Sequence, residues 1–152
     1  MTKTIMAPTS FIPTSNKTIV FYHGHCPDGC AAVLALLLHY REVRPEHKVR
    51  LVKSYVSKKN ITSRQVCGMI GESDVIYLDF THSEEIMQAV QHRVRWKKRS
   101  FLVIDHHVSS ERSLSCIRDE YKIFDTTRSA AGIAWEFFHP GKPVPDLYRL
   151  IQ

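Results

Sequence analysis

The sequence predicts an α/β fold in three layers, in which a mostly parallel sheet carries helices on both faces. Apolar runs at residues 75–78 and 101–104 are typical of strands that are buried on both sides. Segments with strand character alternate with helical patterns, which indicates a parallel sheet with right-handed crossovers. At 152 residues, with 43% hydrophobic and 24% charged residues, the chain has the length and composition of one globular domain.

Residues 1–17 carry prolines and no hydrophobic period, so we expect them to form a disordered N-terminal arm. The globular domain is expected at residues 18–152. Its first strand, at residues 18–22, is β-branched and aromatic. A polar turn containing glycine and an apolar helix at residues 31–40 follow. This order aims loop side chains and a helix N-terminus at a phosphate or a metal ion.

The rest of the chain continues the alternation of strands and helices. Further strands are expected at residues 49–56, 75–78, 101–104 and 121–124. Further helices are expected at residues 62–70, 83–94, 129–138 and from 145 onward. Thr62 and Ser83 are expected to cap the helices that they precede. The basic residues 95–99 are more typical of a solvated helix end than of a nucleic-acid track.

The composition indicates the cellular compartment of the protein and the kind of partner that it binds. No apolar run approaches the roughly 18 residues that span a bilayer, so we expect no membrane partner. Four cysteines without a secretory signal indicate a reducing compartment, and we expect a cytoplasmic protein. A mitochondrial presequence is the alternative, but the first residues lack arginine and an amphipathic pattern. The net charge of +6 favours an anionic partner without showing one.

Titratable side chains follow the predicted strands at the point where each strand ends. Asp28 follows the first strand, Asp79 follows the strand at 75–78, and Asp105, His106 and His107 follow the next. Because ligands of open α/β sheets bind at the carboxyl ends of parallel strands, we expect these groups to lie at one edge. Carboxylates and imidazoles together suit a divalent ion, so the pattern favours metal or phosphate chemistry over exposed loop residues.

Four segments, in this order, resemble the motifs of the DHH phosphoesterase superfamily: HGHCPDGCAA, LDFTHS, IDHHVSS and FDTTRSAAGIAWEFF. The superfamily includes oligoribonucleases, cyclic-nucleotide phosphodiesterases, single-strand exonucleases and manganese-dependent inorganic pyrophosphatases. The resemblance covers roughly residues 18–152. It implies a hydrolase with two divalent cations, most often Mn²⁺ and alternatively Mg²⁺, that activate water for attack on phosphorus.

The resemblance also implies a role for each motif residue. The implied metal ligands are His23, Asp28, Asp79 and His106. Asp79 would bridge the two ions. The implied catalytic residues are His107, which would face the scissile phosphate, and Asp105, which would orient a histidine. Arg128 and Ser129 precede a helix where they could hold the substrate phosphate, and the alternative is a helix cap beside a solvated arginine.

The first motif departs from the commonest form of the family, in which two aspartates lie one residue apart. We expect His23 rather than His25 to be the ligand. Cys26 is expected to be a packed thiol rather than a ligand to a softer ion. A structural zinc site built on Cys26 and Cys30 is a poor match to the usual spacing of cysteine pairs.

The resemblance further implies a later metal-binding aspartate and a smaller substrate-binding domain, and Gln152 precedes both. We therefore expect either a truncated phosphoesterase domain or a short form with an incomplete second metal site. The expected function is hydrolysis of phosphodiester bonds in short oligonucleotides or cyclic nucleotides. The alternatives are a catalytically weak module of the same fold that binds metal or nucleotide, and an inorganic pyrophosphatase.

Overall fold

The computed structural model describes residues 4–6, 8, 10–54 and 60–151, and it contains one six-stranded sheet in the order β1-β6-β5-β4-β2-β3. The strands are β1 (Thr4–Met6), β2 (Lys17–His23), β3 (Lys48–Ser54), β4 (Asp74–Leu78), β5 (Phe101–Asp105) and β6 (Lys122–Asp125). Strands β2 to β6 pair in parallel, and β1 pairs antiparallel with β6. The prediction of a mostly parallel α/β sheet is confirmed.

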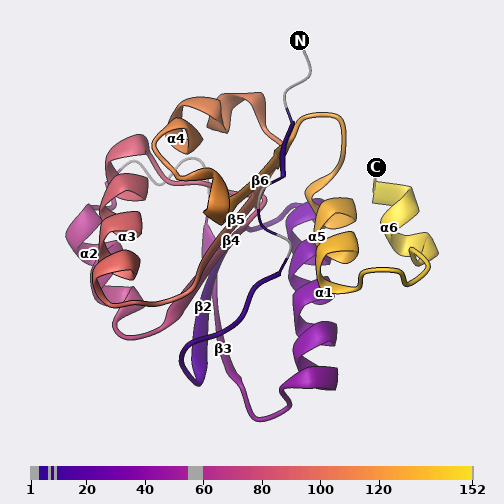
Figure 1. Ribbon diagram of the computed structural model, residues 1–152. Helices are drawn as coiled ribbons and strands as arrows, with labels where there is room; N and C mark the ends of the chain where they lie inside the picture. Colours follow the sequence, from indigo (N-terminus) through magenta and orange to yellow (C-terminus); the bar gives the residue numbers. More distant parts are fainter. Residues whose placement is uncertain (1–3, 7, 9, 55–59, 152) are drawn as a thin grey trace.

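Helices cover both faces of this sheet (Figure 1). The helices are α1 (Pro27–Val43), α2 (Ser63–Ile70), α3 (Glu84–Trp96), α4 (Glu111–Ser115), α5 (Ala130–Phe138) and α6 (Asp146–Ile151). Short 3₁₀ turns, η1 (Val108–Ser110) and η2 (Asp119–Tyr121), flank α4 in the chain. Within the described residues, no helix combines the length and the apolar character needed to cross a membrane.

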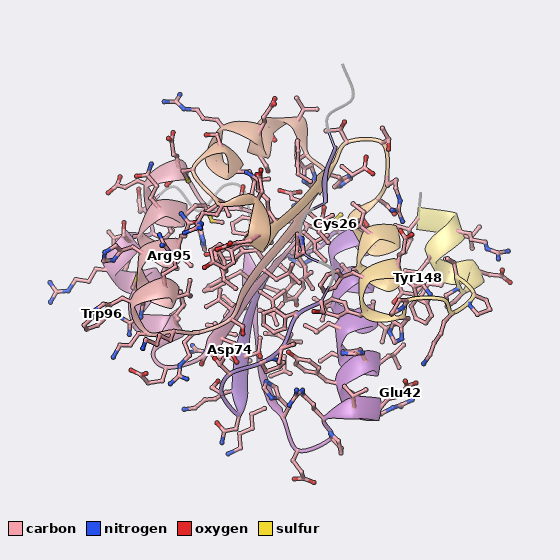
Figure 2. The ribbon with its side chains drawn as sticks, in the orientation of Figure 1. Cys26, Glu42, Asp74, Arg95, Trp96 and Tyr148 are labelled. Atoms are coloured by element: carbon pink, nitrogen blue, oxygen red, sulfur yellow. The ribbon has the colours of Figure 1, made fainter. Side chains whose placement is uncertain are left out.

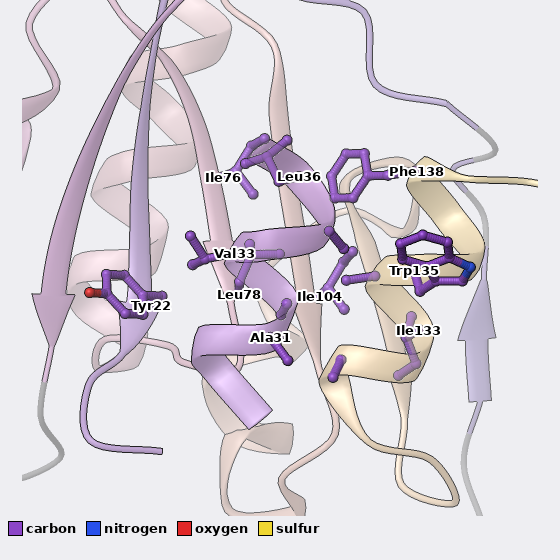
Figure 3. Packing of buried hydrophobic residues seen from close by; sticks show 14 of the residues in the cluster. Tyr22, Ala31, Val33, Leu36, Ile76, Leu78, Ile104, Ile133, Trp135 and Phe138 are labelled. Carbon is purple, nitrogen blue, oxygen red and sulfur yellow. The ribbon is translucent and has the colours of Figure 1, made fainter. Parts of the chain in front are cut away.

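The buried strands divide their side chains between two hydrophobic clusters, one on each face. In β4, Ile76 and Leu78 belong to the cluster with α1 and α5, whereas Val75 and Tyr77 belong to the cluster with α2 and α3. Figure 3 shows Ile76, Leu78 and residues of α1 and α5 in the first cluster. Successive strand residues point to opposite faces, so a continuous apolar run serves both clusters at once.

The chain changes direction across the sheet between β2 and β4. From β2 it passes to β3 on one side, and from β3 it crosses back to β4 and continues to β5 and β6. In open α/β sheets such a reversal opens a crevice at the carboxyl ends of the two strands that flank it. Tyr22 is level with Leu78, and Leu78 is level with Ile104. His23, Asp79 and Asp105 therefore stand side by side at that edge.

The start of helix α1 differs from the sequence prediction. The helix begins at Pro27 rather than at residue 31, because proline is preorganised for the first helical turn and its missing N–H is not needed there. Asp28 and Gly29 consequently belong to the first turn of the helix. The predicted cap of α2 is confirmed, since Thr62 and Gln65 form a reciprocal capping box. Ser83 is the N-cap of α3, but its side chain makes no capping bond.

The prediction of a disordered arm over residues 1–17 is wrong for part of that stretch. Residues 4–6 form β1, and the amides of Thr14 and Ser15 each donate to Asp74 Oδ2 at 2.9 Å. Asp74 is fully buried at the amino end of β4, and it also accepts from the Ser100 amide. A buried carboxylate requires hydrogen-bond donors. Asp74 therefore holds Thr14 and Ser15, which supply two of these donors, against the sheet. Figure 2 labels Asp74 near the opposite end of the sheet from Cys26.

The predicted strand at residues 49–56 corresponds to β3, and its last two residues lie outside the described part of the chain. The basic segment 95–99 follows the expected pattern of a solvated helix end. Lys97 and Arg99 both pair with Glu72, and Trp96 is 72% exposed (Figure 2).

Candidate metal centre

Three of the predicted metal-binding side chains converge at the carboxyl edge of the sheet. His106 Nε2 lies 3.1 Å from Asp28 Oδ2 and 3.0 Å from Asp79 Oδ1. The two carboxylates come from different elements, since Asp28 lies in the first turn of α1 and Asp79 directly follows β4. The convergence expected from the sequence is present.

Asp79 lies at the centre of the cluster. Its backbone adopts a left-handed conformation, with φ of 59°, which aspartate tolerates better than most residues. Its amide donates to the carbonyl of Ile104 at 2.9 Å, which ties the end of β4 to β5. The carboxylate is completely buried, and among the described residues Oδ2 has no hydrogen-bond partner. A buried charged oxygen without a donor is costly unless a cation neutralises it.

Asp105 holds the loop that carries the two histidines. Its Oδ1 accepts from the amides of His106 and His107 at 2.8 and 3.3 Å, and it lies 2.7 Å from His107 Nδ1. This hydrogen bond raises the pKa of His107. It also fixes the ring, because Nδ1 must carry the proton that faces the carboxylate. The contact is the one that an orienting role for Asp105 requires.

Asp28 joins the first turn of α1 to the start of α5. Its Oδ1 accepts from the Ala131 amide at 2.6 Å, and its Oδ2 accepts from the Ala130 amide at 3.2 Å. Burial alone would raise the pKa of Asp28, but hydrogen bonds from His106 and from these amides hold it below its usual value. The carboxylate therefore stays ionised, as a metal ligand must be.

Two overlapping groups of side chains present ligand atoms that lie within 4.8 Å of one another, and each group could hold a metal ion. One group is Asp79, Asp105, His106 and His107, and the other is His23, Cys26 and Asp79. Asp79 belongs to both. His23 Nδ1 lies 3.6 Å from Asp79 Oδ2, whereas His25 is exposed in the same loop. The structure thus places His23 in the cluster, as expected.

Cys26 also lies beside this cluster. The sequence predicts a packed thiol, and its sulfur lies within 4.8 Å of ligand atoms of His23 and Asp79. Burial raises the pKa of this thiol. The signal that could have identified it is its position between His23 and Asp28 in one tight turn.

The two predicted phosphate-binding residues have intramolecular partners. The Ser129 hydroxyl accepts from the Gly132 amide at 3.0 Å and caps α5, and Arg128 pairs with Glu136. A capping role was the alternative interpretation of Ser129, and phosphate binding by either residue stays a prediction. Asp125, which the sequence analysis did not single out, ends β6 and accepts from the amide and hydroxyl of Thr127. It orders the turn that leads into α5.

A cavity of about 490 Å³ adjoins the cluster on the face covered by α2, α3 and α4. At the metal-centre end its wall contains His23, Asp79 and His107. Its apolar lining comes from Phe21, Val52, Ile61, Met69, Phe80 and Ile86, and its polar lining includes Lys53, Ser54, Thr81, His82, Ser83, Ser109, Ser110 and Ser113. Burial lowers the pKa of His82 to about 4, so this imidazole is neutral at pH 7.

Metal-free protein should become less stable as the pH rises from about 6.5, the ordinary pKa of histidine. Hydrogen bonds to Asp28 and Asp79 raise the pKa of His106 to about 10. Protonated His106 therefore stabilises the fold fully below pH 6.5, and this contribution is lost as the pH approaches about 10. Thermal melts between these pH values should show the decline. The His106→Gln variant should show a shallower one, and an unchanged slope in this variant would contradict the assignment.

Comparison with curated proteins finds a similar sequence in an uncharacterized protein of Acanthamoeba polyphaga mimivirus. The two chains are 29% identical over 139 residues, which cover 88% of this chain and 32% of the viral protein. The chain thus spans about a third of the length of this relative. No protein-family model and no solved structure matches the chain.

Proposed function

We propose that this protein is a divalent-metal-dependent phosphodiesterase that acts on short oligonucleotides or cyclic nucleotides. The observation that carries the proposal is the position of Asp79, whose carboxylate belongs to two groups of side chains that could each hold a metal ion. One carboxylate shared by two ions is the arrangement that two-metal hydrolases require. The resemblance of the four sequence motifs to DHH phosphoesterases supports the same reaction class.

The residues of the cluster fit divalent cations. Asp79 Oδ2, Asp105 Oδ2 and His23 Nδ1 are buried, and none has a hydrogen-bond partner within the described part of the chain. Carboxylate oxygens and imidazole nitrogens suit Mn²⁺, and Mg²⁺ accepts the oxygens. We propose two such ions that share Asp79, one on the side of His23 and the other on the side of His106 and Asp28. When bound, they would activate water and neutralise charge at the phosphoryl group.

The chain's own groups would position the substrate. His107 lines the cavity, and its Nδ1 is engaged by Asp105, so its Nε2 remains to contact a phosphate oxygen. Because the pKa of His107 is raised, the ring is protonated more often than an ordinary histidine and donates from Nε2. Asp28, held by two amides of α5, fixes the opposite side of the cluster.

The adjoining cavity supports a nucleotide as the substrate. Its volume of about 490 Å³ is that of a small-molecule site, and it opens beside the cluster rather than elsewhere on the surface. Phe80 and Met69 offer an apolar wall for a base, since nucleobases stack on aromatic and apolar side chains. Serine hydroxyls from η1 and α4 can hydrogen-bond a sugar or phosphate.

The proposal is tested by incubating the purified chain with Mn²⁺ and a short RNA, a cyclic dinucleotide or inorganic pyrophosphate. We expect mononucleotides from the first two substrates, no hydrolysis of pyrophosphate, and full inhibition by a chelator. The His107→Gln variant should lose most of the activity, whereas His92→Gln, at an exposed position on α3, should retain it. Metal binding without hydrolysis of any substrate would instead indicate a catalytically weak binding module.

A further inference from the structure

We propose that Cys26 is a metal ligand, and that His23, Cys26 and Asp79 form a mixed nitrogen, sulfur and oxygen site that prefers Zn²⁺ or Co²⁺ to Mn²⁺. The inference rests on the metal centre of the proposed function and assigns different ion preferences to its two positions. The other group, which contains Asp79, Asp105, His106 and His107, offers only oxygen and nitrogen. Soft thiolate ligands select softer ions than carboxylates do.

The geometry of the three donor atoms supports this assignment. One ligand atom each from His23, Cys26 and Asp79 lies within 4.8 Å of the others, and His23 Nδ1 is 3.6 Å from Asp79 Oδ2. These last two atoms are buried, and neither has a hydrogen-bond partner among the described residues. The Asp79 side chain is completely buried. A buried carboxylate oxygen and a buried imidazole nitrogen that lack hydrogen bonds, with a thiol within 4.8 Å of both residues' ligand atoms, provide three donors for one cation.

Cys26 lies at the N-terminus of α1, beside His23 and Asp79. Cys26 is the N-cap of α1, and its side chain makes no capping hydrogen bond. The Asp28 and Gly29 amides of this turn face the sulfur, but burial raises the pKa of the thiol, so a bound cation is needed to hold Cys26 as a thiolate. Binding of the ion would release the thiol proton to solvent as the sulfur–metal bond forms.

Gly29 allows the first turn of α1 to lie close to His23 and Asp79. A Cβ at this position would lie 2.5 Å from the His23 carbonyl oxygen and 3.3 Å from Asp79 Oδ2. The first turn of α1 therefore packs directly against the end of β2. This close packing holds the segment from His23 to Cys26 over Asp79. Cys30, one helical turn later, is exposed and belongs to neither metal-binding group.

Cobalt spectroscopy tests the inference without measuring activity. Metal-free protein titrated with Co²⁺ should develop a sulfur-to-cobalt charge-transfer band in the near ultraviolet. The band should be absent from Cys26→Ser and unchanged in Cys30→Ser, the matched control from the same helix. Identical spectra for wild type and Cys26→Ser would overturn the proposal, as would Co²⁺ binding to the wild type without the band. Circular dichroism establishes that both variants are folded.

The ion preference gives a second measurement. In competition titrations, Cys26→Ser should lower Zn²⁺ affinity by at least the roughly 10–100-fold that loss of an outer-sphere partner costs. Cys26→Asp should bind Mn²⁺ more tightly relative to Zn²⁺ than the wild type does, because a carboxylate replaces the thiolate. An unchanged Zn²⁺ to Mn²⁺ preference in both variants would contradict the assignment.

The experimental outcomes that would refute this inference differ from those that would refute the proposed function. Hydrolysis with Mn²⁺ in a protein whose cobalt form shows no thiolate band would refute the role of Cys26 alone. A thiolate band in a protein that hydrolyses none of the substrates would refute the proposed activity alone. A wild-type protein that binds neither Co²⁺ nor Mn²⁺ would refute both.

Discussion

Asp79→Asn is expected to abolish metal-dependent hydrolysis and to weaken the binding of both ions. The carboxylate belongs to both groups of side chains that could hold a metal ion, and an amide cannot neutralise two cations. Loss of several kcal/mol of electrostatic stabilisation corresponds to a decrease in kcat/KM of about 1,000-fold. Calorimetry should show that Asp79→Asn lowers the affinity for Mn²⁺ more than Cys26→Ser does, because Cys26 belongs to only one of the two groups.

The fold should tolerate the same substitution. Asparagine has the size of aspartate and accepts a left-handed backbone, so φ of 59° at this position introduces no new strain. Circular dichroism should show unchanged secondary structure. Asp146→Asn, at an almost fully exposed carboxylate on α6, provides the control and should retain both affinity and activity. Wild-type Mn²⁺ affinity in Asp79→Asn would show that Asp79 is not a shared ligand.

Gly29→Ala is expected to have the second large effect, on both stability and the metal centre. The added Cβ would lie 2.5 Å from a backbone oxygen, the His23 carbonyl, which cannot move aside without displacing the end of β2. Overpacking of this kind costs about 1–3 kcal/mol. Because the displaced segment also carries His23 and Cys26, metal affinity should fall together with stability.

Gly68→Ala is the matched control for that change. Gly68 also lies in a helix, α2, but a Cβ there would meet nothing within 4 Å. Alanine in a helix is favoured over glycine by about 0.5–1 kcal/mol, so this variant should be more stable than the wild type. Urea denaturation measures both variants. Equal stability of Gly29→Ala and wild type would mean that α1 does not pack as closely on β2 as the structure shows.

The sequence was sufficient to predict the sheet and the edge at which the cluster lies. Hydrophobic runs such as residues 101–104 have one simple explanation, a strand that is covered on both faces. Parallel strands end at the same edge, so the sequence predicts that Asp79 and His106 lie together, and His106 Nε2 lies 3.0 Å from Asp79 Oδ1. Asp28 is predicted at the same edge because it lies in the turn after the first strand, and that turn starts at the carboxyl end of the strand.

Other parts of the structure depend on three-dimensional contacts that leave no pattern in the sequence. The position of Cys26 depends on where α1 begins, and a start at Pro27 rather than residue 31 turns the thiol toward Asp79. Strand β1 has only three residues, and its pairing with β6 is a long-range contact without a local pattern. The pairing of Arg128 with Glu136 similarly depends on how α5 follows its cap.

The bonds between Asp28 and the start of α5 determine when the centre can form during synthesis. Asp28 and Ala130 are 102 residues apart in the chain. At a translation rate of about 5–20 residues per second, Asp28 precedes its amide donors by roughly 5–20 s. Contacts between such distant residues also form late in folding, because they require closure of a long loop. Asp28 of the newly made chain therefore lacks these two amide donors until residues 130 and 131 have been synthesised.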